Sequence, residues 1–344
     1  MIKKIFFKTV FSKKVGTGHF YRTINLAKSL SKKKVEIYFI VNQNSLKKKI
    51  AKENLRLKFI KKIYLFKNLK SEIKFLSKST VPNIIIDDPN FSYNQQIQYK
   101  KFIQKKLFLY QDTPKKNLAD VIINHNYIKN FRKIYNKLSK NNAHLLVGIK
   151  YFQKKGKKNF YKKVKKAKKI HIFFGGLPND KILKFVLNIL SNNYNEKIFV
   201  NCFLGIFNKK LNHFKKKYKR IIFHKTKKQS LYLKSLNKSD LFIGSGGTSL
   251  MESLIFGIPS LIFCTAKNQL DNCENFNNDK SIVFIKDKKV FKKNFINLFF
   301  NSKNITKLRV NSIKASKVIG SINLTNKLNI QHLFLCNVGC RKIS

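Results

Sequence analysis

Short apolar runs alternate with amphipathic stretches along most of the chain. In the first half, five runs rich in β-branched and aromatic residues lie at 5–10, 35–41, 84–86, 106–110 and 121–123. Their length and composition are typical of buried strands. The stretch 20–30 between the first two runs repeats apolar residues at the spacing of one helix face. Strands and helices in this alternation predict a parallel sheet with helices on both of its faces.

The same alternation restarts in the second half. Strand-like runs lie at 170–174, 198–204, 221–223, 241–243, 261–263 and 281–285. The 344 residues suit two domains of about 150 residues each, and a Lys-rich break lies at about 148–169. We therefore predict an α/β protein with two Rossmann-like domains at 1–150 and 165–335. We expect C-terminal helices after the last strand and a loose tail past about 335.

The chain is strongly basic, with 74 Lys and Arg against 15 Asp and Glu and a formal charge of +59. Only six of the basic residues are Arg, whereas Lys, Asn, Ile and Phe, which have A/T-rich codons, are all abundant. Readers of nucleic acid favour Arg for forked contacts to phosphate and guanine. We therefore attribute most of the charge to base composition and expect no nucleic-acid partner, although a positive site would still attract an anionic nucleotide.

Cysteine usage and hydropathy suggest a cytoplasmic protein. The five cysteines are Cys202, Cys264, Cys273, Cys336 and Cys340. Their scattered spacing indicates neither a disulfide framework nor a zinc site, so we expect reduced thiols and no metal. No apolar run approaches about 18 residues, and Lys8 interrupts the first run, which we interpret as a core strand and not a signal peptide. We expect no stable membrane insertion, no cofactor and a monomeric protein.

A glycine-rich turn with a histidine follows the first predicted strand. Gly16, Gly18, His19 and Arg22 lie where this strand gives way to the first helix. Ligands of open α/β sheets bind beyond the carboxyl ends of strands, and a helix N-terminus there favours anions. A neutral imidazole at that place can take a proton from water. The alternative is a common Gly-x-Gly turn whose histidine only begins the helix.

A second glycine-rich turn follows the strand at 241–243. Gly246, Gly247, Thr248 and Ser249 would offer backbone N–H groups and hydroxyls to a pyrophosphate at the start of the next helix. Glu252, one helical turn later, could accept the two hydroxyls of a ribose. The alternative is a first-turn glutamate that only complements the helix dipole.

Weaker candidates follow other strands. They are Asp87, Asp88, Gly175, Gly176, Asn268 and Gln269. Either aspartate could orient the ring of His19 or take part in its proton transfer. Alternatively, it could only form the turn before Pro89. The remaining histidines, His125 among them, stand apart without metal spacing, and we interpret them as structural.

Together these segments resemble the UDP-sugar hydrolases of pseudaminic acid biosynthesis, the PseG family. The resemblance rests on Gly16-Thr-Gly-His19-x-x-Arg22, Ile85-Ile-Asp87-Asp88, Gly148-x-Lys-Tyr151, Phe173-Phe-Gly-Gly176, Ile243-Gly-Ser-Gly-Gly-Thr-Ser-Leu-Met-Glu252, Gly257-Ile-Pro259 and Asn268-Gln269, in that order. It implies a GT-B-like arrangement with an interdomain cleft. The first domain would hold the sugar and the catalytic His19, and the second would hold UDP. His19 would activate water to hydrolyse a UDP-linked 2,4-diacetamido-2,4,6-trideoxy sugar.

Three positions depart from the family pattern. Lys8 and Val10 stand where the family has Arg and Asp, and Pro89 stands where it has Tyr. All three positions belong to the sugar side in the family, so the sugar and the hydrolysis step remain open. The alternative enzyme is a glycosyltransferase that gives the sugar of a UDP-sugar to an acceptor. A nucleic-acid-binding protein is the alternative outside enzymes.

Overall fold

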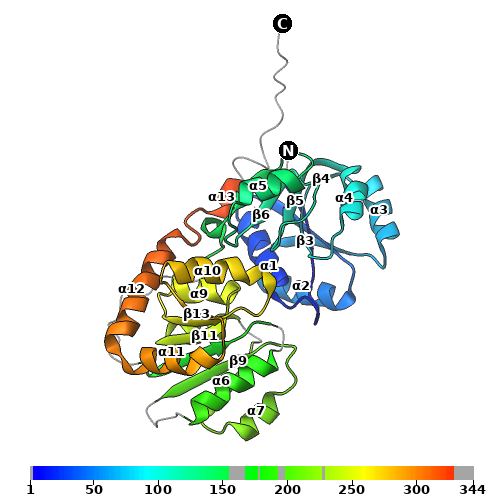
Figure 1. Ribbon diagram of the computed structural model, residues 1–344. Helices are drawn as coiled ribbons and strands as arrows, with labels where there is room; N and C mark the ends of the chain where they lie inside the picture. Colours follow the sequence, from blue (N-terminus) through cyan, green and yellow to red (C-terminus); the bar gives the residue numbers. More distant parts are fainter. Residues whose placement is uncertain (1–2, 155–166, 177–178, 193–197, 227–228, 329–344) are drawn as a thin grey trace. The chain divides into compact units, whose positions relative to one another are not determined.

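The computed structural model describes residues 3–154, 167–176, 179–192, 198–226 and 229–328 (Figure 1). Among these, residues up to 125, 129–153 and 322–328 form one compact unit, unit 1, and residues 126–128 and 154–321 form the other, unit 2. Most of the predicted connection between the domains, at 155–166, and the predicted loose tail past 335 lie outside the described residues.

Unit 1 contains a seven-stranded sheet of order β3-β2-β1-β4-β5-β6-β7, parallel throughout. Its strands are β1 (Lys3–Thr9), β2 (Val35–Val41), β3 (Ile60–Leu65), β4 (Val81–Asp87), β5 (Ile103–Tyr110), β6 (Val121–Asn124) and β7 (His144–Val147). Its helices are α1 (Gly18–Ser31), α2 (Asn44–Leu57), α3 (Leu69–Lys78), α4 (Tyr93–Lys100), α5 (Phe131–Leu138), the short 3-10 helix η1 (Ile149–Tyr151) and α13 (Leu324–Lys327). The sequence did not predict β3 and β7, because β3 is interrupted by lysines and β7 begins with an exposed histidine and buries only its last two residues.

Unit 2 contains a six-stranded parallel sheet of order β10-β9-β8-β11-β12-β13. Its strands are β8 (Lys169–Phe173), β9 (Phe199–Leu204), β10 (Ile221–Lys225), β11 (Leu241–Ser245), β12 (Ser260–Phe263) and β13 (Val283–Ile285). Its helices are α6 (Asp180–Asn192), α7 (Leu211–Lys217), α8 (Gln229–Asn237), α9 (Thr248–Ile255), the 3-10 helix η2 (Lys267–Gln269), α10 (Leu270–Asn278), α11 (Lys289–Phe300) and α12 (Ser302–Val318). The predicted fold class, two parallel Rossmann-like sheets, is confirmed.

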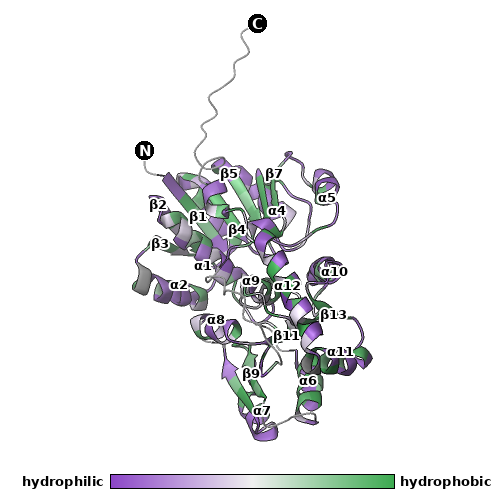
Figure 2. Cartoon of the chain, turned by 90° about the vertical axis from the view of Figure 1, so that its left-hand side faces the viewer, coloured by the Kyte–Doolittle hydropathy of each residue, from purple (hydrophilic) through white to green (hydrophobic). Residues whose placement is uncertain are grey.

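Alternation along the strands assigns side chains to the two faces of each sheet. Ile5 and Phe7 of β1 pack with Phe20 of α1 in the core of unit 1, whereas Phe6 points to the other face and stacks on Tyr38. Figure 2 shows hydrophobic residues along the strands and hydrophilic residues on the outer sides of the helices. Because both faces are covered, the strands read as nearly continuous apolar runs.

The chain returns to unit 1 after α12, which corrects the predicted end of the second domain at 335. Ile322 N–H donates to the Lys150 carbonyl oxygen at 3.0 Å. Leu324 and Leu328 are buried in the core of unit 1, where α13 contacts α1. The short amphipathic α13 carries no strand signal, so the sequence alone could not assign it to the earlier sheet.

Each sheet has a place where the strand order reverses. In unit 1 it lies between β1 and β4, and in unit 2 between β8 and β11. The loops after these strands diverge to opposite sides there and leave room for a ligand at the carboxyl edge. The two predicted glycine-rich turns, after β1 and after β11, lie at these two places.

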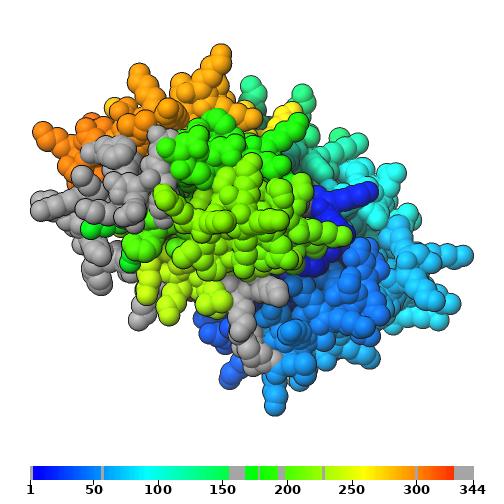
Figure 3. Space-filling model, turned by 90° about the horizontal axis from the view of Figure 1, so that it is seen from below, coloured from blue at the N-terminus to red at the C-terminus, as the bar shows by residue number. Residues whose placement is uncertain are grey.

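The basic residues lie mostly on the surface. Figure 3 shows long side chains that project into solvent from segments throughout the sequence. Lys8 is a buried exception with 6% exposure. Within the described part of the chain, no helix is both long and apolar enough to cross a membrane.

His171 is a buried polar residue in the core of unit 2. Its ring stacks on Phe203 and meets the edge of Tyr232, and its Nε2 has no hydrogen-bond partner among the described residues. Burial, and then the charge of His224, lower the pKa of His171 from 6.5 to about 3. The unfolded chain therefore binds a proton first as the pH falls, so the stability that is present above pH 6.5 is lost toward pH 3.

We expect His171→Phe to remove this acid sensitivity and to change the stability at pH 7 by no more than about 1 kcal/mol, because a ring of similar size removes the unpaired Nε2 but also loses the 3.2 Å hydrogen bond between Nδ1 and the Ser235 hydroxyl. The shift corresponds to a wild-type loss of about 2 kcal/mol between pH 7 and pH 5 from this group. Urea unfolding at both pH values measures it. Equal losses in wild type and variant would contradict the assignment.

Candidate active site

The turn after β1 places α1 at the carboxyl edge of the unit 1 sheet. Gly16 N–H donates to the Ser12 carbonyl oxygen at 2.8 Å, and Gly16 has a φ of +86°, which favours glycine. The helix begins at Gly18, so His19 lies in its first turn. A Cβ built at Gly18 would meet nothing within 4 Å, which leaves open space over the helix start.

His19 is held by the buried carboxylate at the end of β4. Its Nδ1 lies 2.6 Å from Oδ1 of Asp87. Because a carboxylate can only accept, Nδ1 carries the hydrogen and Nε2 is the nitrogen available for proton exchange. Arg22 Nη2, 2.9 Å from the same Nδ1, is also a donor and bonds to the Asp87 carboxylate.

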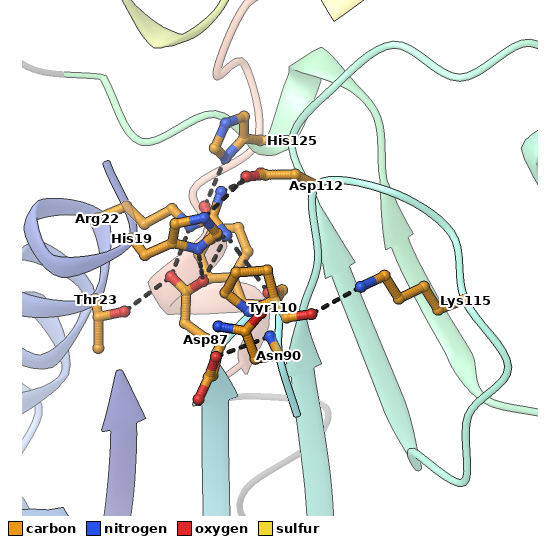
Figure 4. Close-up of polar contacts among 11 residues, drawn as sticks. His19, Arg22, Thr23, Asp87, Asn90, Tyr110, Asp112, Lys115 and His125 are labelled. Carbon is orange, nitrogen blue, oxygen red and sulfur yellow. Dashed lines mark hydrogen bonds and ion pairs between the residues drawn. The ribbon is translucent and has the colours of Figure 1, made fainter. Parts of the chain in front are cut away.

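Arg22 lies between two carboxylates, as Figure 4 shows. Its Nε donates to Oδ2 of Asp87 at 2.6 Å and its Nη2 donates to Oδ1 at 2.5 Å. Its Nη1 donates to Oδ1 of Asp112. The Tyr110 ring lies under the guanidinium, 4.2 Å from Cζ. One helical turn separates His19 from Arg22, so both reach Asp87 from the same face of α1.

Asp87 is completely buried and accepts four hydrogen bonds. The donors are His19 Nδ1, Arg22 Nε and Nη2, and the hydroxyl of Thr23 at 2.9 Å. Burial raises the pKa of Asp87, but the charges of Arg22 and His19 outweigh it and hold the pKa below its usual range. Asp87 is therefore ionised and fixes the ring of His19.

Asp112 was not predicted, although it completes the network. It follows β5, and its Oδ2 lies 3.4 Å from His19 Nε2. Its side chain is 24% exposed, compared with 11% for His19 and Arg22 and 0% for Asp87. Burial raises the pKa of Asp112, yet Arg22 and then His19 lower it far below its usual range. The rule that ligand-facing residues follow the carboxyl ends of strands would have identified it.

A second layer of side chains supports Arg22. Tyr110 and His125 share a hydrogen bond of 2.8 Å between the phenol oxygen and Nδ1. Burial and the charge of Arg22 lower the pKa of His125 to about 4, so this ring is neutral at pH 7. Gln153 Nε2 approaches the Arg22 carbonyl oxygen at 3.5 Å. His125 thus borders the network as a buried supporting residue, which is the structural role predicted for it.

The other sugar-side candidates lie outside this network. Asp88 Oδ1 accepts from Asn90 N–H at 2.9 Å, the turn role that the sequence left open. The Pro89 carbonyl oxygen accepts from Lys115 Nζ at 2.7 Å. Lys8 Nζ lies 2.6 Å from Glu72 of α3 in a buried ion pair. The change at Lys8 therefore concerns the α3 face of the sheet and not the surroundings of His19.

In unit 2, neighbouring residues of the protein fill part of the space beside the glycines of the turn after β11. A Cβ at Gly246 would lie 2.2 Å from the Cys273 Sγ, and one at Gly244 would lie 2.4 Å from the Phe173 carbonyl oxygen. These two glycines are required by internal packing. A Cβ at Gly247 would first meet Gln269 Nε2, at 3.4 Å. Only the later part of the turn therefore has room for a ligand.

The start of α9 divides the predicted diphosphate residues. Thr248 is exposed and Gly247 is half-buried, whereas Gly246 and Ser249 are buried. The Ser249 hydroxyl points back to the Ser245 carbonyl oxygen at 3.4 Å. Leu250 N–H already donates to the Gly247 carbonyl oxygen at 3.0 Å, so the N–H groups of Thr248 and Ser249 are the first-turn donors that could meet an anion.

Glu252 lies on the inner side of α9. It is 4% exposed. It lies near the phenol of Tyr232; burial and then Glu252 raise the pKa of that phenol. A ribose that uses Glu252 must therefore reach a largely covered carboxylate.

The remaining candidates border the same edge of the unit 2 sheet. Gln269 Oε1 accepts from the Thr265 N–H and hydroxyl, each at 3.1 Å, and its side chain lies beside Gly246 and Gly247. Gly175, with a φ of +93°, lies near Ser245, since its built Cβ would be 3.8 Å from that hydroxyl.

Gly176 and Asn268 are the last two predicted residues at this edge of the unit 2 sheet. The Gly176 carbonyl oxygen would lie 2.3 Å from a Cβ built at Gly205, so the chain approaches closely there. Asn268 is half-buried in η2. Among the described residues, no group of three or more His, Cys, Asp or Glu side chains is arranged to hold a metal ion.

Comparisons with known proteins give the fold and one distant relative. No protein-family model matches the chain. An uncharacterized protein of Methanocaldococcus jannaschii, MJ1062, is 28% identical over 268 residues, which cover 73% of this chain and 53% of that protein. The chain thus spans about half the length of the curated relative that it matches.

Solved structures of sugar enzymes share the fold. A Listeria monocytogenes protein assigned as a UDP-N-acetylglucosamine 2-epimerase has a TM-score of 0.62 at 12% identity, over 96% of this chain and 95% of that one. The glycotransferase of kitacinnamycin has a TM-score of 0.59 at 11% identity, over 95% and 97%. The spinosyn rhamnosyltransferase SpnG, with spinosyn aglycone, has 0.59 at 10%, over 94% and 98%. At these identities the similarity shows the fold alone, which is GT-B-like.

We expect Arg22→Met to destabilise the protein by about 3–5 kcal/mol at pH 7, because two carboxylates lose their shared countercharge. In the wild type, the stability from the low pKa of Asp87 is present above its ordinary value of 3.8 and is lost as the pH falls through it. Without Arg22, burial favours the protonated carboxyl of Asp87. The difference in unfolding free energy between the wild type and the variant should therefore become smaller as the pH is lowered from 7 to 5. Urea unfolding at these pH values measures the difference, and a gap independent of pH would contradict the prediction.

The two glycine-rich turns should respond differently to an added methyl group. In Gly18→Ala the added methyl group enters open space at a helix start. The free energy of unfolding should stay the same or rise by no more than about 1 kcal/mol, and the melting temperature should follow it. Gly246→Ala meets buried Cys273 and should cost about 1–3 kcal/mol. Thermal unfolding of both variants compares them. Equal effects would show that Gly18 is also packed.

Proposed function

We propose that the chain hydrolyses a UDP-linked 2,4-diacetamido-2,4,6-trideoxy sugar, releasing UDP and the free sugar. The single observation that supports this most strongly is the fixed orientation of His19. Asp87 holds Nδ1, and Nε2 faces the partly exposed Asp112 at the carboxyl edge of the unit 1 sheet. The choice of sugar rests on the resemblance to the PseG family. The GT-B-like fold agrees with nucleotide-sugar chemistry, since the similar structures include a UDP-N-acetylglucosamine 2-epimerase and glycosyltransferases.

In the proposed reaction, Nε2 of His19 takes a proton from water while the water oxygen bonds to the anomeric carbon. The bond from that carbon to the phosphate oxygen breaks, and its electron pair leaves with UDP. Asp87 stabilises the imidazolium through Nδ1 and keeps the ring in place. Because the pKa of Asp112 lies far below its usual range, this carboxylate is a poor base for the attacking water.

We further propose that the α9 helix start receives the diphosphate. Gly247 and Thr248 are accessible, and the N–H groups at the start of a helix favour anions. Gly246 supports the turn, and Gln269 lies beside it. Glu252 would accept the ribose hydroxyls. Backbone donors and the helix dipole would then stabilise the leaving charge.

The alternative is transfer of the sugar from the same donor to a hydroxyl acceptor. The glycosyltransferases among the similar structures favour it. Hydrolysis and transfer use the same proton acceptor. They differ in whether the oxygen of water or that of an acceptor alcohol bonds to the anomeric carbon.

The test is incubation with the UDP-sugar in ¹⁸O-labelled water without an acceptor, followed by mass spectrometry. Hydrolysis at the anomeric carbon places ¹⁸O in the free sugar and none in UDP. We expect His19→Asn to lower the rate about 10²–10⁴-fold, as is usual for a lost proton acceptor. Exposed His213 on α7 supplies the matched control, His213→Asn, which should keep the wild-type rate.

Release of UDP only after an acceptor alcohol is added would replace hydrolysis by transfer. Label in UDP would contradict attack at the anomeric carbon. An unchanged rate in His19→Asn would remove His19 from the reaction altogether.

A further inference from the structure

The two nitrogens of His19 meet carboxylates in unequal ways. The contact of Nδ1 with Asp87 is 2.6 Å, the length of a strong charge-assisted hydrogen bond. The contact of Nε2 with Asp112 Oδ2 is 3.4 Å. The first contact fixes the ring, whereas the second is longer and leaves Nε2 without a short hydrogen bond to Asp112.

We propose that Asp112 is a positioning residue that stabilises the protonated form of His19 during turnover. The proposal rests on the proposed function. When water gives its proton to Nε2, the resulting Nε2–H can donate to Oδ2 of Asp112. The proton then passes from Nε2 to water, Asp112 stays ionised, and Nε2 regains its lone pair for the next cycle.

Charge balance explains why a second carboxylate is needed. The groups that face His19 are Arg22 on its own helix, Asp87 at the end of β4 and Asp112 after β5, with neutral His125 behind them. Arg22 alone would oppose a second positive charge beside it. With both aspartates ionised, the network accommodates Arg22 and a protonated His19 with no net charge.

The position of Arg22 makes Asp112 specific for this role. Nη1 of Arg22 holds Oδ1 of Asp112, which turns Oδ2 toward Nε2. Arg22 also holds both oxygens of Asp87, so one guanidinium fixes the two carboxylates on either side of the imidazole. Asp112 is more exposed than Asp87, so it is the carboxylate that lies toward solvent beside Nε2.

The experiment compares Asp112→Asn and Asp112→Glu with the wild type, and uses Asp279→Asn, an exposed carboxylate at the end of α10, as the matched control. We expect Asp112→Asn to lower kcat about 10–100-fold with KM little changed. We also expect it to move the acidic limb of the pH–rate profile to lower pH by about one unit, because a negative charge beside the base is lost. Asp112→Glu should restore part of kcat, and Asp279→Asn should behave as wild type.

A readout without substrate separates this proposal from the proposed function. In ¹⁵N-histidine NMR of the unliganded protein, Asp112→Asn should move the Nε2 signal of His19, while the Nδ1 signal stays as in the wild type. An unmoved Nε2 signal, or a change confined to KM, would overturn the role of Asp112 whether or not the UDP-sugar is hydrolysed. If the Nε2 signal moves but the protein does not turn over the UDP-sugar, the contact between His19 and Asp112 is supported and the proposed hydrolysis is contradicted.

Discussion

The buried carboxylate of Asp87 is the interaction on which the arrangement of unit 1 depends. It lies at the carboxyl end of β4, where the strand order reverses, and it is completely covered. An ionised group in that position is tolerated only when it is paired and fully hydrogen-bonded. Arg22, His19 and Thr23 supply those bonds from consecutive turns of α1. The same bonds that satisfy Asp87 therefore fix the helix start, its histidine and the bridge to Asp112.

Unit 2 uses the same edge of the same kind of sheet differently. Its glycine-rich turn carries no titratable side chain at the helix start, and two of its glycines are needed because Cys273 and the Phe173 backbone lie against them. The exposed Thr248 and the half-buried Gly247 leave a place for an anion but supply no base. Among the described residues, the cluster of His19, Arg22 and two carboxylates therefore lies in unit 1, and the glycine-rich helix start without a titratable side chain lies in unit 2.

Much of this could be predicted from the sequence, because the strands are buried on both faces and appear as apolar runs. The turns after β1 and β11 were found because glycine, a following helix and a preceding strand leave a local pattern. β3 was not predicted because its lysines break the apolar pattern, and β7 because only its last two residues are buried. Asp112 was not among the predicted residues although it follows the predicted strand at 106–110, and the strand order decides that it meets His19.

The sequence by itself determined the elements and their order, since hydrophobic periodicity and glycine placement are local properties. It also identified His19, Arg22 and Asp87 as candidates, because each lies at a strand's end or a helix's start. Tertiary structure alone decided which candidates meet. It joined Asp87 to α1 across 68 residues and Asp112 to Arg22 across 90, and it directed Asp88 into a turn and Lys8 to Glu72. Those choices depend on sheet order and on which face each side chain takes, and both are settled only when distant segments pack.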